Sequence, residues 1–73
     1  MVDYKKIIPM RLEYLRDKYD FTQEEIAKKI GIKQPTYCNY EKGKHIPNLE
    51  TICKIADIYN TSIDLLIGRT DIK

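Results

Sequence analysis

Residues 22–32 read TQEEIAKKIGI, and this segment gives the clearest indication of the fold. The hydroxyl of Thr22 can cap a helix, and Glu25, three residues later, can bond back to the Thr22 backbone, which is the pattern of a capping box. The isoleucines inside the stretch repeat at helical spacing, and Gly31 supplies the left-handed residue that ends many helices. The stretch therefore predicts a short helix over residues 23–30, followed by a tight turn.

Helical spacing of apolar residues continues on both sides of this helix, and no segment alternates at the period of a strand. Further helices are expected over Pro9–Tyr19, Lys33–Lys42, Leu49–Tyr59 and from Ser62 to Gly68. Asn48 and Ser62 are good caps for the last two helices. We therefore expect an all-α fold, in which residues 1–73 form a single compact domain of five helices. Its core should span about residues 8–68, between a frayed N-terminal arm and a frayed tail, Arg69–Lys73.

Composition narrows the range of functions. Seventy-three residues suffice for one small core, and 13 basic against 11 acidic residues give a net charge of only +2. The basic excess falls within residues 22–45, with five basic and three acidic side chains. Two cysteines cannot build a disulfide framework, and the longest apolar run is three residues. We expect a cytoplasmic protein with free thiols, no signal peptide and no membrane role.

The helix over residues 23–30 and the helix that follows it match a known supersecondary motif. Two short helices joined by a turn that contains glycine, the second polar on its outer face, describe a helix-turn-helix. Ala27 supplies the small residue where the two helices cross. The side chains expected to pack the unit onto the rest of the domain are Ile26, Ile30, Ile32, Tyr37 and Tyr40.

The sequence resembles the lambda-repressor-like, or Cro-type, helix-turn-helix proteins, also called the XRE family, over roughly Arg11 to Gly68. The resemblance is carried by TQEEIAKKIGI, by YEKGK at residues 40–44 and by PNLETICKIA at residues 47–56. Two positions depart from the family pattern: Tyr37 stands where Ile or Val is usual, and Pro35 lies in the first turn of the recognition helix. The resemblance implies a transcriptional regulator, expected to be a repressor, which places the helix starting near Lys33 in the major groove of double-stranded DNA.

The same resemblance implies which side chains contact DNA. The base-contacting candidates are Lys33, Gln34, Pro35, Thr36, Cys38 and Asn39, and the phosphate-contacting candidates are Gln23, Thr36, Lys42, Lys44 and His45. Gln34 is the strongest base-reading candidate, because its amide can pair with N6 and N7 of adenine. Amides at the start of the helix that begins with Gln23 suit an anion. The alternative is that these polar side chains are merely solvated.

The resemblance and the hydrophobic pattern also imply a salt bridge within the domain and contact between two copies of it. Arg16 and Glu41 correspond to a structural salt bridge that many members of the family bury. A homodimer, at least on DNA, is expected because one small reader covers few base pairs, and two half-sites about 10 bp apart would form a near-palindromic operator. The residues expected at the dimer interface are Ile63, Leu66 and Ile67, unless they simply close the monomer core.

Other classes of function find less support in the sequence. There is one histidine and no phosphate-binding glycine loop or nucleophile motif, so we expect no enzyme and no cofactor. Cys38, His45 and Cys53 follow one another at intervals of seven and eight residues, unlike the tight pairs of zinc modules, so no metal site is expected. The remaining alternative is an antitoxin or another regulator of the same fold that binds a protein partner. The short stretch after Gly68 favours the plain regulator.

Overall fold

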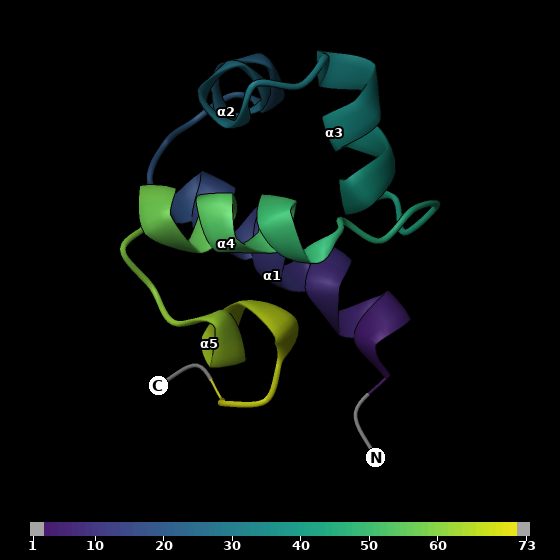
Figure 1. Ribbon diagram of the computed structural model, residues 1–73, viewed down its shortest axis with the longest axis vertical. Coiled ribbons are helices and arrows are strands. Elements are labelled where there is room, and N and C mark those ends of the chain that lie inside the picture. Colours follow the sequence, from purple (N-terminus) through teal and green to yellow (C-terminus); the bar gives the residue numbers. More distant parts are fainter. Residues whose placement is uncertain (1–2, 72–73) are drawn as a thin grey trace.

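Five helices make up the regular structure of residues 3–71, which are the residues that this computed structural model describes (Figure 1). They are α1 (Tyr4–Lys18), α2 (Gln23–Ile30), α3 (Gln34–Glu41), α4 (Leu49–Ile58) and α5 (Ile63–Ile67). No strand occurs within that range. The predicted all-α, five-helix fold is therefore confirmed, with the ends of α2 to α5 within about one residue of their predicted positions.

Local chemistry explains where most of the helices begin and end. The Thr22 hydroxyl accepts from the Glu25 amide at 3.0 Å, and the Thr22 amide donates to the Glu25 carboxylate at 2.9 Å, so the capping box is complete. Asn48 and Ser62 cap α4 and α5 through the amides three residues later. Gly31 and Gly68 end α2 and α5 with φ near +89°, a conformation that glycine adopts without strain.

The first helix is longer than its sequence pattern indicates. It begins at Tyr4 rather than near Pro9, so the expectation of a frayed arm before the core was wrong for residues 4–7. The carbonyl of Asp3 accepts from the amides of Lys6 and Ile7, and Ile8 is buried in the core. Packing of these residues outweighs the single helical hydrogen bond that Pro9 removes. The part of the predicted arm at residues 1–2 lies outside the described residues.

Hydrogen bonds also hold the chain segment that follows α5 against the rest of the domain. The amides of Arg69 and Thr70 donate to the carbonyl of Asp64, and the buried guanidinium of Arg11 donates to the carbonyls of Leu65 at 2.6 Å and Thr70 at 2.9 Å. The prediction of a frayed tail was therefore wrong for residues 69–70, because Asp64 accepts from both of their amides and Arg11 donates to the carbonyl of Thr70. Residues 72–73 of the predicted tail lie outside the described residues.

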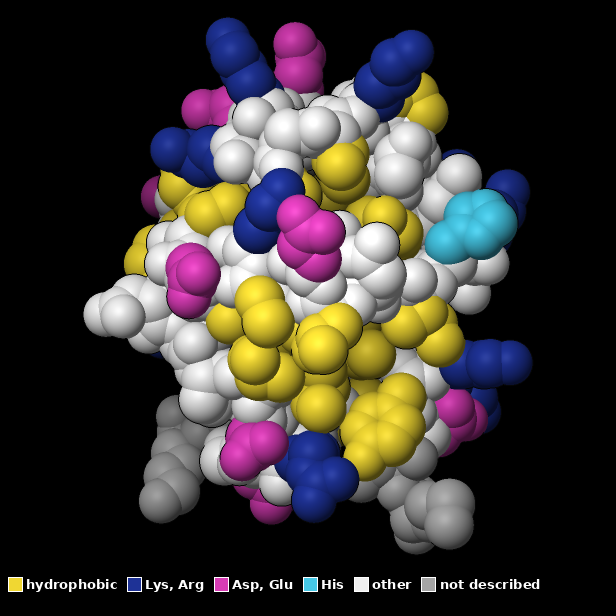
Figure 2. Space-filling view, viewed as in Figure 1, with side chains coloured by type: hydrophobic (Ala, Val, Ile, Leu, Met, Phe, Trp, Pro, Cys, Tyr) yellow, Lys and Arg dark blue, Asp and Glu magenta, His cyan; other side chains and the backbone are white. Residues whose placement is uncertain are grey.

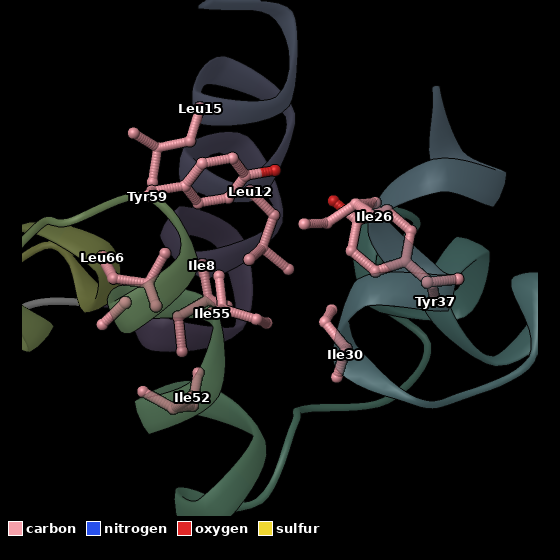
Figure 3. Close-up of a cluster of buried hydrophobic side chains, with 12 residues drawn as sticks. Ile8, Leu12, Leu15, Ile26, Ile30, Tyr37, Ile52, Ile55, Tyr59 and Leu66 are labelled. Carbon is pink, nitrogen blue, oxygen red and sulfur yellow. The ribbon is translucent and has the colours of Figure 1, made fainter. Parts of the chain in front are cut away.

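One hydrophobic core joins all five helices (Figure 3). The helix-turn-helix pair α2 and α3 lies at one end of the molecule and α5 at the other, with α1 and α4 between them (Figure 1). The fully buried side chains with the largest volumes are Tyr37, Tyr59, Leu12, Ile26, Ile55 and Leu66. Ile30 is buried as predicted, and Ile32 and Tyr40 pack against the core while remaining partly exposed. Of the helices in the described part of the chain, none has the length and apolar composition needed to cross a bilayer.

Candidate nucleic-acid interface

The turn between α2 and α3 sets the position of the recognition helix. The amides of Gly31 and Ile32 both donate to the carbonyl of Ala27, at 2.9 Å and 3.0 Å. Ala27 itself is buried, as expected for the small residue at the helix crossing. A side chain at Gly31 would meet no atom within 4 Å, so this position requires glycine for its positive φ and not for space.

Most of the predicted DNA-contacting side chains are accessible to solvent. The exposed residues in this set are Lys33, Gln34, Pro35, Thr36, Lys42, Lys44 and His45, and the half-buried ones are Cys38, Asn39 and Gln23. The exposed residues fall in two groups, one at the start of α3 and one in the loop that follows it. The first group presents amide, hydroxyl and apolar surfaces, and the second presents basic side chains, which suits base edges and phosphates respectively.

A hydrogen-bonded chain of four side chains connects α1 to the exposed start of α3. Arg16 donates to both carboxylate oxygens of Glu41, at 2.6 Å from Nε and 3.1 Å from Nη2. Gln23 Nε2 donates to Glu41 Oε1 at 3.2 Å, and Gln34 Nε2 donates to Gln23 Oε1 at 3.2 Å. We call Arg16, Glu41, Gln23 and Gln34 the polar network.

The polar network orients the two amides one after the other. The carboxylate of Glu41 can only accept, so Gln23 must turn its NH₂ group toward it, and the Gln23 oxygen then faces Gln34. Gln34 consequently turns its NH₂ group toward Gln23 and keeps its oxygen and its second N–H free. One free acceptor and one free donor are what pairing with adenine N6 and N7 requires.

Charge within the polar network is stabilised by its own hydrogen bonds. Burial raises the pKa of Glu41, but hydrogen bonds from Arg16 and Gln23, together with the nearby hydroxyl of Tyr37, outweigh it, so the pKa lies below its ordinary value. The hydrogen bond to Glu41 raises the pKa of Arg16. Both groups are therefore charged at neutral pH, and the side chain of Glu41 is only 5% exposed.

The sequence did not indicate the hydrogen bond between Gln23 and Gln34. These residues lie 11 positions apart on different helices, and the contact depends on the angle at which the helices cross. The signal that could have found it is a glutamine at the first position of each helix in a helix-turn-helix unit. The Arg16–Glu41 pair expected from the family resemblance is present.

One of the three expected dimer residues does not reach the surface. Leu66 is completely buried, so its assignment to a dimer interface was wrong: the inward face of α5 carries it into the core. Ile67 is partly buried against the core, and Ile63 is 37% exposed. Leu49, at the start of α4, is 72% exposed. Figure 2 shows hydrophobic side chains gathered where α4 and α5 adjoin.

The residues considered for a metal site remain apart. Within residues 3–71, no three His, Cys, Asp or Glu side chains lie in an arrangement that could hold a metal ion. Cys38 and Cys53 are free and half-buried.

Comparison with known proteins adds to this geometry. The family model described as helix-turn-helix matches residues 12–66. An uncharacterised HTH-type transcriptional regulator of Archaeoglobus fulgidus is 44% identical over 54 residues, which are 74% of this chain and 77% of that protein. The cryptic phage CTXphi transcriptional repressor RstR of Vibrio cholerae is 42% identical over 62 residues, 85% of this chain and 55% of the relative.

A solved structure has the same fold. It is the solution structure of the SOS-response transcriptional repressor LexA from Eubacterium rectale, with a TM-score of 0.85 and 31% sequence identity. The similarity covers 99% of this chain and 79% of that one.

Proposed function

Because this chain belongs to the helix-turn-helix family, whose members are non-enzymatic DNA-binding transcriptional regulators, we propose that it is a repressor that reads the major groove with the start of α3. Repression is supported by relatives named as repressors. It would act by occupying a promoter.

The observation that carries the proposal is the oriented amide of Gln34. Its free oxygen and remaining N–H, held by Gln23 and ultimately by the Arg16–Glu41 pair, suit an adenine edge. Side chains already ordered in the free protein lose less entropy on binding. Asn39 offers a second amide on α3, and Pro35 and Thr36 offer apolar contact to a thymine methyl.

Phosphate contacts would supply affinity on both sides of α3. Gln23 retains one N–H of its side chain, and the exposed hydroxyl of Thr36 can also donate. Lys42, Lys44 and His45 form the basic group after α3, and Lys33 stands at its start. Such contacts set the position on DNA and contribute affinity without reading sequence.

A homodimer in the cytoplasm, bound to a near-palindromic operator, completes the proposal. Half-sites about 10 bp apart would match a two-fold symmetric pair of recognition helices. Exposed apolar side chains on α4 and α5 support dimerisation, since Leu49 is 72% exposed, Ile63 is 37% exposed and Ile67 is partly exposed.

The test is selection of binding sites from a random pool of duplex DNA. The enriched site and a scrambled site are then titrated at several salt concentrations, since phosphate contacts make affinity depend on salt. We expect a near-palindrome bound at least about a thousandfold more tightly than the scramble. No enrichment, with only weak salt-sensitive binding, would instead favour the antitoxin-like role with a protein partner.

A further inference from the structure

Two buried tyrosine hydroxyls near the polar network lack a hydrogen-bond partner among the described residues. Tyr37, on α3, is completely buried, and Tyr59, directly after α4, is 1% exposed. Within residues 3–71, neither hydroxyl has a hydrogen-bond partner. Figure 3 shows the two hydroxyls directed toward each other across the core. Buried hydroxyls nearly always have partners, so these two call for an explanation.

The carboxylate of Glu41 has room for one more donor. Glu41 lies four residues after Tyr37, which places the two side chains on the same face of α3. A carboxylate offers about four acceptor positions. Arg16 and Gln23 occupy both positions of Oε1 and one of Oε2, so a single position on Oε2 is left.

The phenol of Tyr37 is electrostatically coupled to this carboxylate. Burial, and after it the nearby Glu41, raises the pKa of Tyr37, which therefore keeps its proton and can act only as a neutral donor and acceptor. Burial raises the pKa of Tyr59 to about 12, with a further contribution from Glu41. Both hydroxyls thus keep a proton that can point toward the negative charge.

We propose that Tyr37 is a positioning residue for DNA recognition: its buried hydroxyl donates to Glu41, directly or through one water molecule, and so holds the carboxylate on which Gln23 and Gln34 are aligned. The hydroxyl of Tyr59 donates in turn to the oxygen of Tyr37. Since the role of Gln34 belongs to the proposed function, this inference rests on it. The core would then set the orientation of the base-reading amide from two directions, through Arg16 and through Tyr37.

The first test does not depend on DNA. The carboxyl pKa of Glu41 is followed by carbon-13 NMR titration in the wild type, Tyr37→Phe, Tyr59→Phe and Tyr40→Phe. Removing the donor in Tyr37→Phe should raise the pKa of Glu41 and shift the side-chain amide signals of Gln23 and Gln34. Tyr40→Phe is the matched control, because Tyr40 packs edge-on against Tyr37 yet makes no bond to the polar network. An unchanged Glu41 titration in Tyr37→Phe would overturn the proposal.

The second test asks whether the hydroxyl acts through Gln34. Affinity for the selected operator is measured for Tyr37→Phe, Gln34→Ala and the double variant. Coupled residues give non-additive effects, so Tyr37→Phe should weaken binding about threefold to tenfold alone and much less in the Gln34→Ala background. Equal losses in both backgrounds would show a merely structural role and overturn the proposal. Thermal unfolding of each variant establishes that it is folded.

The two proposals can fail separately. If the wild type selects no operator, the proposed function fails, and the NMR titration still decides whether Tyr37 donates to Glu41. If the wild type selects an operator and Tyr37→Phe alters neither the titration nor the coupling to Gln34, only the inference about Tyr37 fails.

Discussion

Arg16 and Glu41, 25 residues apart in sequence, form a two-point ion pair that joins α1 to the last residue of α3. Arg16 also donates to the carbonyl of Phe21, just before the cap of α2, at 3.1 Å. One guanidinium therefore fixes three segments of the domain. The same pair holds Gln23, which in turn bonds to Gln34, so folding and the proposed recognition of DNA depend on the same charges.

Glu41→Ala should destabilise the protein by about 3 kcal/mol, the lower end for breaking a buried pair, because Arg16 is left without its anion but keeps some access to water. Glu50→Ala, which breaks the exposed Glu50–Lys54 pair, should cost at most about 1 kcal/mol. Chemical denaturation measures both. Similar losses for the two variants would mean that the Arg16–Glu41 pair acts as an ordinary surface contact.

Stability should fall in acid as Glu41 takes up a proton. Its pKa is lowered in the folded state relative to the ordinary value of 4.5, so its contribution is fully present above pH 4.5 and disappears as pH falls through the folded pKa. The free energy of unfolding of the wild type should therefore exceed that of Glu41→Gln near neutral pH, with the gap narrowing below pH 4.5. Parallel profiles for the two proteins would contradict this assignment.

Gln34→Ala and Lys44→Ala should impair DNA binding in different ways. Loss of the base-reading amide should cost about 1 to 3 kcal/mol on the selected operator and relax the preference at one base pair. Loss of the Lys44 charge should weaken all sequences alike and reduce the dependence of affinity on salt. Titrations on the operator, a base-substituted operator and a scrambled duplex separate the two patterns. Equal effects on every duplex would remove Gln34 as a base reader.

Leu49→Lys and Leu66→Ala should separate dimerisation from folding. Leu49 is largely exposed, so a charge there should dissociate the proposed dimer while leaving the free energy of unfolding of the monomer nearly unchanged. Leu66 is completely buried, so its truncation should cost about 2 to 5 kcal/mol. Sedimentation equilibrium and denaturation distinguish the outcomes. A Leu49→Lys protein with unchanged mass and operator affinity would exclude this surface as the dimer interface.

Gly31 and Gly68 share a φ near +89° but differ in their surroundings, so their substitutions by alanine should have different effects. Gly31→Ala meets no neighbouring atom and should cost about 1 to 2 kcal/mol for the left-handed backbone alone. A Cβ at Gly68 would lie 2.6 Å from side-chain atoms of Ile7, so Gly68→Ala should cost about 1 to 3 kcal/mol more. Thermal unfolding gives the comparison, and Ile7→Ala should reduce the difference. Equal losses at the two glycines would argue against close packing of Ile7 on Gly68.

Much of the fold follows from local sequence because helix ends depend on neighbouring residues. The capping box of Thr22 with Glu25, the left-handed Gly31 and the cap Asn48 each act within a few positions, and each is present as predicted. The start of α1 does not follow from such signals, because Pro9 suggests a beginning that the packing of Ile8 and its neighbours overrides. The position of Thr70 likewise depends on Arg11, which lies more than fifty residues away.

Local sequence is enough to place the five helices, the helix-turn-helix unit and the set of polar residues at the start of α3, since periodicity and caps are local properties. The direction in which those residues face depends on the tertiary structure. The Gln23–Gln34 hydrogen bond, the burial of Leu66 rather than Leu49, and the approach of Tyr37 to Tyr59 all depend on how helices cross. Crossing angles come from packing of many side chains at once, which no short stretch of sequence specifies.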